Sequence, residues 1–285
     1  MGPATATVAG SLRWAAEQLA VAGIEGPRRE ARLLLALATG IGRERQLGDP
    51  DRQLQPAAVA RLGELVGRRR AREPMAYIRG SAPFWDFELA IRPGVLVPRP
   101  ETEVLVEAAT ARAAGRDVAR ILDLGTGSGC IVLALLRQFP QATGTGLDRS
   151  PAALACAAEN ARQLGLEGRL HLVAGDWAAA PPGLYELIVA NPPYVADGEL
   201  AGLQPEVRDY EPRLALAGGA DGLDPYRILA PLAATLAARS GLVAFEHGAG
   251  QADAVAALLS AAGFVAVQHH QDLAGIRRCV TARRP

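Results

Sequence analysis

The spacing of apolar residues changes twice along this chain of 285 residues. Over roughly the first 75 residues, apolar positions recur three and four apart, as on one face of a helix. Between residues 84 and 91 they alternate with polar positions, as in a strand with one buried face. From Asp117 onward, short apolar runs alternate with helical patterns. The pattern therefore predicts a helical segment, a short β segment and an α/β region, in that order.

The helical segment contains three predicted helices. The first carries Val8 to Leu19 on its apolar face and ends at Gly23. The second begins at Pro27 and ends at Gly40, and the third runs from Pro56 to Arg70. Proline suits the first turn of a helix, where its missing N–H has no partner to lose. We expect residues 1–80 to form a small helical bundle.

The β segment is predicted to be a hairpin that joins two domains. Residues 84–91 read as one strand, Arg92-Pro93-Gly94 as a turn and residues 95–97 as the returning strand. The hairpin linker then covers residues 81–97, and the second domain covers residues 98–285.

The second domain is predicted to be a mainly parallel sheet with helices on both faces. The expected strands are 119–124, 143–148, 169–174, 185–190, 241–246, 264–269 and 276–282, and the expected helices are about 128–138, 151–164, 223–238 and 250–261. The connection between the last two strands is too short for a crossover helix. The final strand should therefore be antiparallel.

Residues suited to ligand binding follow each of the first four strands. They are Asp123 with Gly125-Thr126-Gly127-Ser128-Gly129, then Asp148, then Asp176-Trp177, and finally Asn191-Pro192-Pro193-Tyr194. Any one of the acidic residues could be a simple turn residue, and Trp177 could belong to the core. However, ligands of open α/β sheets bind beyond the carboxyl ends of the strands. Four such corners at one edge predict one ligand crevice.

The first three corners fit S-adenosylmethionine. Glycines let the backbone approach a ligand closely, and Asp123 suits an ammonium group. Asp148 lies 148 − 125 = 23 residues after the first glycine of the loop, where a carboxylate can accept both hydrogen bonds of a ribose diol. Asp176 and Trp177 could bind the adenine. A nicotinamide dinucleotide is less suited, because it requires G-x-G-x-x-G and a pyrophosphate on the helix N-terminus.

The fourth corner presents a polar amide on a rigid turn. The strand must end at Asn191, because Pro192 and Pro193 have no N–H to donate. The corner suits the binding of a planar amide or amine. Taken alone, it could also be a plain Pro-Pro turn with a capping Asn.

Composition limits the other functions. No stretch of about 20 apolar residues lacks a charge, so neither a membrane span nor a secretion signal is predicted and we expect a cytoplasmic protein. The three cysteines and four histidines show no disulfide or metal-ligand spacing, so no metal is expected. The net charge is zero, but residues 1–80 carry 13 Arg against 8 Asp and Glu, a net +5, which leaves −5 on residues 81–285. Direct binding of free nucleic acid is not expected, although a basic small domain could dock an acidic protein or a ribonucleoprotein.

From about Leu12 to Arg283 the chain resembles the release-factor glutamine N5-methyltransferases, the PrmC/HemK family. The matching blocks are Glu73-Pro74, Tyr77-Ile78, Gly80, Phe84, Leu96 to Glu103, Asp123 to Cys130, Asn191 to Tyr194, Tyr210 to Pro212, Ala215-Leu216 and Asp221 to Asp224. The Asn-Pro-Pro-Tyr motif also occurs in DNA N6-adenine methyltransferases, so it indicates the chemistry and not the substrate. The block from Pro98 to Glu103 is more restrictive. One departure is His247, where the family usually carries an aliphatic residue.

The resemblance implies a Rossmann-like class I methyltransferase with a seven-stranded sheet and S-adenosylmethionine as cofactor. It implies that the acceptor is the glutamine of a Gly-Gly-Gln motif in class-I peptide chain release factors. We expect the N-terminal bundle to recognise this protein substrate, and the alternative is that it only stabilises the catalytic domain. On this hypothesis the Asn191 side-chain oxygen and the Pro192 carbonyl accept the two amide protons, while Tyr194 packs on the amide plane. The alternatives are a ribosomal-protein glutamine methyltransferase, an adenine-N6 nucleic-acid methyltransferase and a non-catalytic binding module.

Overall fold

The computed structural model describes residues 6–285, which form two compact units. The first unit contains the described chain up to Gly80 together with Pro205–Tyr210. The second contains Ser81–Gln204 and Glu211–Pro285. Residues 205–210 therefore leave the second unit and pack with the first, which the sequence pattern did not predict.

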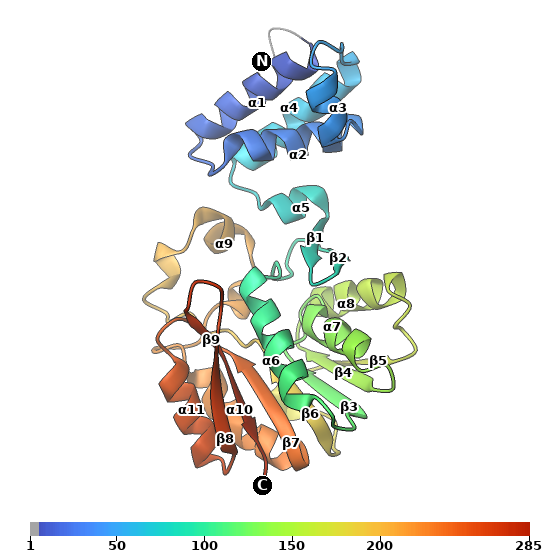
Figure 1. Cartoon of the computed structure of the whole chain (residues 1–285). Coiled ribbons are helices and arrows are strands. Elements are labelled where there is room, and N and C mark those ends of the chain that lie inside the picture. Colours follow the sequence, from blue (N-terminus) through green and yellow to red (C-terminus); the bar gives the residue numbers. More distant parts are fainter. Residues whose placement is uncertain (1–5) are drawn as a thin grey trace. The chain divides into compact units, whose positions relative to one another are not determined.

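The first unit is a bundle of short helices (Figure 1). They are α1 (Val8–Val21), α2 (Pro27–Thr39), α3 (Arg43–Gly48), α4 (Pro56–Arg70), α5 (Met75–Arg79) and α9 (Pro205–Tyr210). The three predicted helices correspond to α1, α2 and α4. The Thr7 hydroxyl caps α1 by accepting from the Gly10 N–H at 3.1 Å. Gly40, at φ 71°, ends α2 in the left-handed conformation that a Cβ disfavours.

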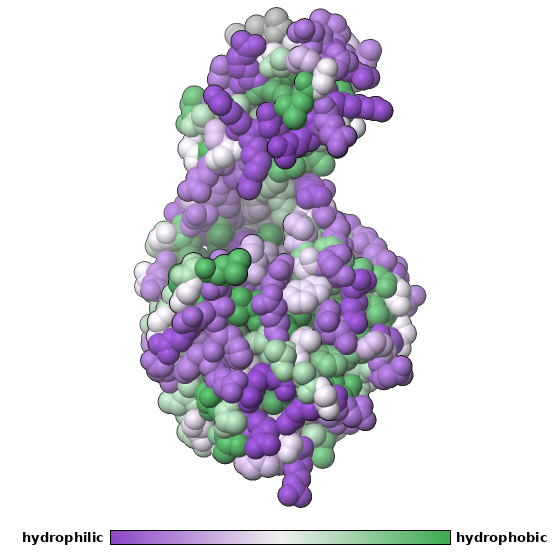
Figure 2. Space-filling view, in the orientation of Figure 1, coloured by the Kyte–Doolittle hydropathy of each residue, from purple (hydrophilic) through white to green (hydrophobic). Residues whose placement is uncertain are grey.

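The bundle has its own hydrophobic core, to which Leu19, Leu34, Leu35 and Leu62 contribute fully buried side chains. On the face shown in Figure 2, hydrophilic residues cover most of the surface of this unit. The helical spacing of the apolar residues thus places them inside, where their burial stabilises the unit.

The hairpin forms, but at a different register from the one predicted. β1 (Ser81–Phe84) pairs antiparallel with β2 (Phe87–Ala90), and the turn lies at Trp85-Asp86. The prediction of one strand over 84–91 with a turn at 92–94 was wrong. Alternation of apolar and polar residues continues across a two-residue turn, and the turn needs Trp85 at φ 58°, which a Trp rarely adopts. The Glu103 carboxylate supports the turn by accepting from the Trp85 N–H at 2.9 Å.

The second unit is built on a seven-stranded sheet. Its strands are β3 (Arg120–Leu124), β4 (Thr143–Asp148), β5 (Leu170–Ala174), β6 (Tyr185–Ala190), β7 (Ala237–Glu246), β8 (Val265–Gln271) and β9 (Arg277–Arg283). The spatial order is β5-β4-β3-β6-β7-β9-β8. β3 to β7 are parallel, and β9 is antiparallel to both of its neighbours, so the predicted reversal of the last strand is confirmed.

Helices cover both faces of this sheet (Figure 1). They are α6 (Glu103–Ala113), α7 (Cys130–Gln138), α8 (Pro151–Gln163), α10 (Asp224–Leu236) and α11 (Ala252–Ala261). α6 packs on α7, and α10 packs on α11. Because β3 to β6 are parallel neighbours, their carboxyl ends lie at one edge of the sheet, and the four predicted corners meet there.

Candidate active site

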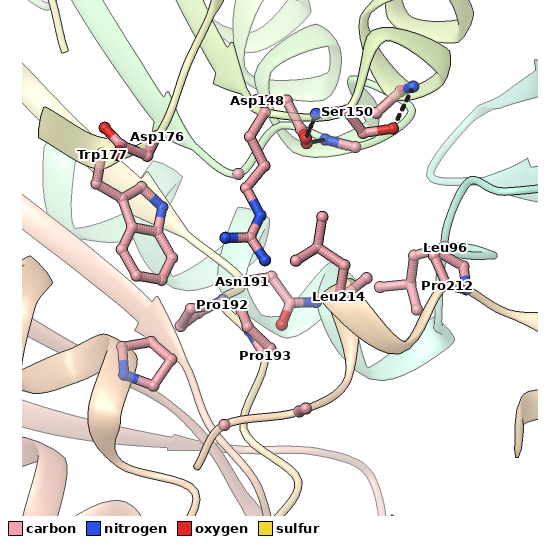
Figure 3. Close-up of a pocket in the computed structure, with 18 of the residues that line it drawn as sticks. Leu96, Asp148, Ser150, Asp176, Trp177, Asn191, Pro192, Pro193, Pro212 and Leu214 are labelled. Atoms are coloured by element: carbon pink, nitrogen blue, oxygen red, sulfur yellow. Dashed lines mark hydrogen bonds between the residues drawn. The ribbon is translucent and has the colours of Figure 1, made fainter. Parts of the chain in front are cut away.

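A cavity of about 610 Å³ opens at the carboxyl ends of the parallel strands. Figure 3 shows it surrounded by Asp148 and Ser150, by Asp176 and Trp177, by the Asn191 turn, and by Leu96 with Pro212. The predicted residues that line it are Gly125, Gly127, Asp148, Asp176, Trp177, Asn191, Pro192 and Pro193. All four corners therefore contribute to one site of the size of a small-molecule pocket.

The glycine loop leaves open space toward the ligand. Gly125 and Gly127 have φ values of 91° and 57°, and a Cβ at either position would meet no atom within 4 Å. Gly129 has a different role, since a Cβ there would lie 3.2 Å from the Cβ of Ala157. It allows α7 to start close to α8. The first two glycines thus serve the cavity and the third serves packing.

Three predicted cofactor residues, one just before this loop and two within it, do not line the cavity. Asp123, Thr126 and Ser128 are all buried. The Thr126 hydroxyl donates to Asp123 Oδ2 at 2.7 Å, while Asp123 Oδ1 has no hydrogen-bond partner. Burial raises the pKa of Asp123 to about 7, and the nearby charge of Asp148 adds to the shift. The carboxylate therefore lacks a donor or a positive charge at its second oxygen.

Asp148 and Asp176 both hold local backbone in place. Asp148 Oδ2 accepts from the Gly127 N–H and Oδ1 from the Ser150 N–H, each at 2.8 Å. Each carboxylate oxygen keeps a further lone pair for a ligand. Asp176 caps a 3-10 turn (Trp177–Ala179) by accepting from the Ala178 N–H at 3.0 Å. The turn-residue interpretation and the ligand interpretation of these acids are thus compatible.

The Asn191 corner is fixed by a contact that the sequence did not predict. Asn191 Nδ2 donates to the Thr102 hydroxyl at 3.2 Å, across 89 positions of sequence. Thr102 lies in a 3-10 turn (Pro100–Thr102) within the Pro98 to Glu103 block. Pro192 is buried, and Tyr194 is half-buried and does not line the cavity. The Tyr194 ring instead faces Gly248, where a Cβ would lie 3.1 Å from it.

A second segment of cavity wall was also missed. Residues 212–215 and 217–219 line the cavity, as do Gly94 to Leu96, Arg149, Ser150, Ala153, Asp224, Pro225 and Ile228. The segment runs beside the strand-end turn, because the Val195 N–H donates to the Leu216 carbonyl at 2.9 Å and the Gly218 N–H to the Val195 carbonyl at 2.8 Å. The Arg99 guanidinium holds its start by pairing with Glu211 at 2.6 Å. The sequence blocks that resemble the family around residues 99 and 211 were the signal that could have located this segment.

Glu246 and His247 form a buried polar pair of residues at the end of β7. They are 2% and 0% exposed. Glu246 Oε2 and His247 Nε2 have no hydrogen-bond partner. Burial raises the pKa of Glu246 to about 7 and lowers the pKa of His247. His247 Nδ1 lies 2.9 Å from the Gly248 carbonyl oxygen, so this ring serves local packing of the strand end.

The donor set of the cavity suits an adenosyl group joined to an amino acid. Two carboxylates and an indole ring stand at the ends of β4 and β5, and a glycine backbone with open space stands at the end of β3. Together with the reversed last strand, this site defines a class I methyltransferase with S-adenosylmethionine as its cofactor.

Comparison with known proteins identifies the family. Residues 11–80 match the family model of the PrmC N-terminal domain, and residues 100–204 match that of the methyltransferase small domain. The chain is 49% identical to a release factor glutamine methyltransferase of Rhodospirillum rubrum over 94% of this chain and 82% of that one. It is 47% identical to the protein of that name from Cereibacter sphaeroides, over 97% and 98%. The chain belongs to the release factor glutamine methyltransferase family.

A solved structure supports the fold. The 16S rRNA methyltransferase of T. thermophilus, determined in complex with AdoMet and guanosine, superposes with a TM-score of 0.52. The two chains are 20% identical, and the match covers 72% of this chain and 50% of that one.

Within residues 6–285, no group of three or more His, Cys, Asp or Glu side chains could hold a metal ion. Cys130, Cys156 and Cys279 are buried and free. Over the same residues, no helix has the length and apolar character needed to cross a membrane.

Proposed function

We propose that this chain transfers a methyl group from S-adenosylmethionine to the side-chain amide nitrogen of the glutamine in a Gly-Gly-Gln motif of class-I peptide chain release factors. The observation that carries the proposal is the Asn191 corner, where the amide nitrogen is bonded to Thr102 and the amide oxygen is left for a ligand. The names of the curated relatives support the substrate class.

The corner overcomes the poor nucleophilicity of an amide. The lone pair of an amide nitrogen is delocalised into the carbonyl, and acceptors that bind both N–H groups reduce that delocalisation. The Asn191 side-chain oxygen and the Pro192 carbonyl would accept these two protons. Pro193 keeps the turn rigid, and Tyr194, whose ring faces Gly248 outside the cavity, would support the turn from behind. Positioning of reacting atoms within about 3.5 Å supplies most of the rate enhancement. After transfer, the excess proton passes to water.

The remaining corners would hold the cofactor, which supplies an electrophilic methyl group. Asp148 accepts from the ribose hydroxyls, and Asp176 with Trp177 binds the adenine. The backbone of Gly125 and Gly127 faces the amino-acid part. Thr126, Ser128 and Gly129 shape the loop, and Asp123 provides the negative charge beneath it.

The helical unit would recognise the protein substrate. Most of its arginines are exposed, including Arg28, Arg29 and Arg43. The net charge of +5 on residues 1–80 suits an acidic partner. The KM for a full-length release factor should then rise with salt more steeply than the KM for a short Gly-Gly-Gln peptide. An equal salt response of the two substrates would contradict this role.

The activity belongs in the cytoplasm, with its release-factor substrate.

Mass spectrometry tests the reaction directly. The protein is incubated with S-adenosylmethionine and a release factor, and the products are digested and sequenced. We expect one added methyl group on the glutamine of the Gly-Gly-Gln motif, and none on a release factor with asparagine at that position. Modification of ribosomal proteins alone would contradict the proposed substrate.

A further inference from the structure

The orientation of the Asn191 amide decides what the corner can bind. An amide side chain has two ends of nearly equal shape, one a donor and the other an acceptor. In the observed orientation Nδ2 donates to Thr102 Oγ1 at 3.2 Å. Thr102 alone cannot select this orientation, because a hydroxyl both donates and accepts. If the hydroxyl hydrogen turned toward Asn191, the opposite orientation of the amide would be equally satisfied.

Glu246 can select between the two orientations of the Asn191 amide. The pairing of Ala190 with Phe245 in neighbouring strands puts Asn191 and Glu246 side by side at the strand ends. Glu246 is 2% exposed and Thr102 is 1% exposed, so water does not compete strongly for either. The Thr102 hydroxyl and the Asn191 amide both act as donors that favour the ionised form of Glu246. Its Oε2 atom has no hydrogen-bond partner, and a buried carboxylate oxygen without one is costly enough to need an explanation.

We propose that Glu246 is a positioning residue that fixes the orientation of the Asn191 amide, acting through the Thr102 hydroxyl and directly on the amide nitrogen of Asn191. The inference rests on the proposed function of Asn191 as an acceptor for the substrate amide. An ionised carboxylate can only accept, so the Thr102 hydrogen turns toward Glu246 and the Thr102 lone pair faces Asn191 Nδ2. The Asn191 oxygen is then left for the substrate. A protonated Glu246 donates instead, and the Thr102 hydrogen can turn toward Asn191 and favour the reversed amide.

The groups around Glu246 allow it to titrate near neutral pH. Burial raises its pKa to about 7, opposed by the Thr102 hydroxyl, while Glu101 raises the pKa and Arg278 lowers it. Four further titratable side chains interact electrostatically with the same carboxylate, and burial together with that charge raises the pKa of each: Cys130, Tyr194, Tyr226 and Cys279. These four stay neutral at pH 7. The positioning should therefore be lost as the pH falls below about 7.

The chain offers a direct spectroscopic test, because Asn160 and Asn191 are its only two asparagines. Protein labelled with ¹⁵N-asparagine gives two side-chain amide signals. Asn160 is an internal reference, since its side chain bonds to the backbone of Ala90 and Ser128. We expect the Asn191 signal to shift with pH, with a midpoint near 7, while the Asn160 signal stays constant. In Glu246→Gln the shift should be lost, and an unchanged Asn160 signal reports an intact fold.

Kinetics supply the second readout. Glu246→Gln and Thr102→Val should lower kcat about 10- to 100-fold, as misplacement of a reacting group does, with the cofactor Kd within twofold. Thr102→Ser, which keeps the hydroxyl, should restore most of the rate. The kcat of the unmodified protein should fall below pH 7, and that of Glu246→Gln should not.

The outcomes separate this inference from the proposed function. An Asn191 signal that does not titrate, or that titrates equally in Glu246→Gln, overturns the positioning role even if methylation proceeds normally. Loss of the shift in Glu246→Gln supports it. Absence of methylation by the unmodified protein contradicts the proposed function, and the NMR titration still decides the positioning role.

Discussion

Two sets of buried charged side chains, one in each unit of this protein, differ in how completely they are paired. In the helical unit, Arg69 is 6% exposed and is surrounded by acceptors. It donates to Glu30 at 2.6 Å and to Glu206 at 2.9 Å, and Arg72 completes this Arg69 cluster by donating to Glu206 at 2.7 Å. In the sheet unit, Asp123 and Glu246 each have one buried carboxylate oxygen without a partner.

The contrast indicates what each set of charges is for. Although burial opposes it, a backbone hydrogen bond and pairing with Arg69 and Arg72 hold the pKa of Glu206 below its usual value. Glu206 therefore stays ionised, and the cluster joins α2, α4 and α9. Burial without such pairing raises the pKa of Asp123 and of Glu246 to about 7. A charge that is fully paired specifies structure, whereas a charge left half-paired is available to a ligand or to a reacting group.

Breaking the Arg69 cluster should have the largest effect, and the effect should be on stability. Arg69→Met keeps the length of the side chain but leaves the buried Glu30 without its partner and removes one of the two arginines that pair with Glu206. Removal of one member of a buried ion pair costs about 3–5 kcal/mol. We expect a loss of that size in the free energy of unfolding, measured in urea by tryptophan fluorescence, to which Trp14 in α1 contributes a signal from this unit.

Arg70→Met is the matched control, because Arg70 follows on the same helix and is exposed. It should change stability by less than about 0.5 kcal/mol. Replacing Glu30 and Glu206 by Gln in the Arg69→Met protein should recover part of the loss. A cost for Arg69→Met as small as that of the control would show that the pairing does not support the unit.

Removing the Asn191 side chain should raise the activation free energy of methyl transfer by nearly as much as Arg69→Met lowers the free energy of unfolding. Loss of one hydrogen-bonding group at a reacting centre lowers kcat about 100- to 1,000-fold. We expect Asn191→Ala to show this loss in a radiolabel-transfer assay. The free energy of unfolding and the cofactor Kd, measured by calorimetry, should stay close to those of the unmodified protein. A wild-type rate would remove Asn191 from the reaction.

The sequence predicted the corners of the site better than the contacts that hold them. Asp148, Asp176 and Asn191 could be found because each ends an apolar strand, and parallel strands bring their carboxyl ends to one edge. Thr102 could not be found in this way, because it meets Asn191 from 89 positions away. Glu246 also ends a strand of the sheet, but its proposed role depends on contact with Thr102, so the strand pattern did not indicate it. The cavity wall at 212–219 has no periodic pattern of its own.

The same limit applies to the fold. The helices and strands were predictable from spacing, but Glu206 pairs with an arginine 137 positions earlier. No local pattern could therefore assign α9 to the helical unit. The hairpin register depended on one residue, Trp85, at positive φ. Periodicity reports which faces are buried, and it does not report which backbone angles a turn requires.

The smallest predicted effect is a pH dependence of stability caused by Asp123. Its pKa of about 7 in the folded protein is above the ordinary value of 3.8, so the folded state binds this proton more tightly than the unfolded state. Stability from this group is complete below about pH 4 and is lost as the pH rises through 7. Between pH 5 and pH 8 the folded protein should lose about 2.5 kcal/mol relative to Asp123→Asn, where no carboxyl titrates. Urea unfolding of both proteins at the two pH values measures this difference.

Asp117→Asn, which changes an exposed aspartate, is the control, and its pH dependence of stability should match that of the unmodified protein. If Asp123→Asn and the unmodified protein showed the same pH dependence, the Asp123 carboxylate would already be paired. S-Adenosylmethionine should reduce the slope, because its ammonium group favours the ionised carboxylate.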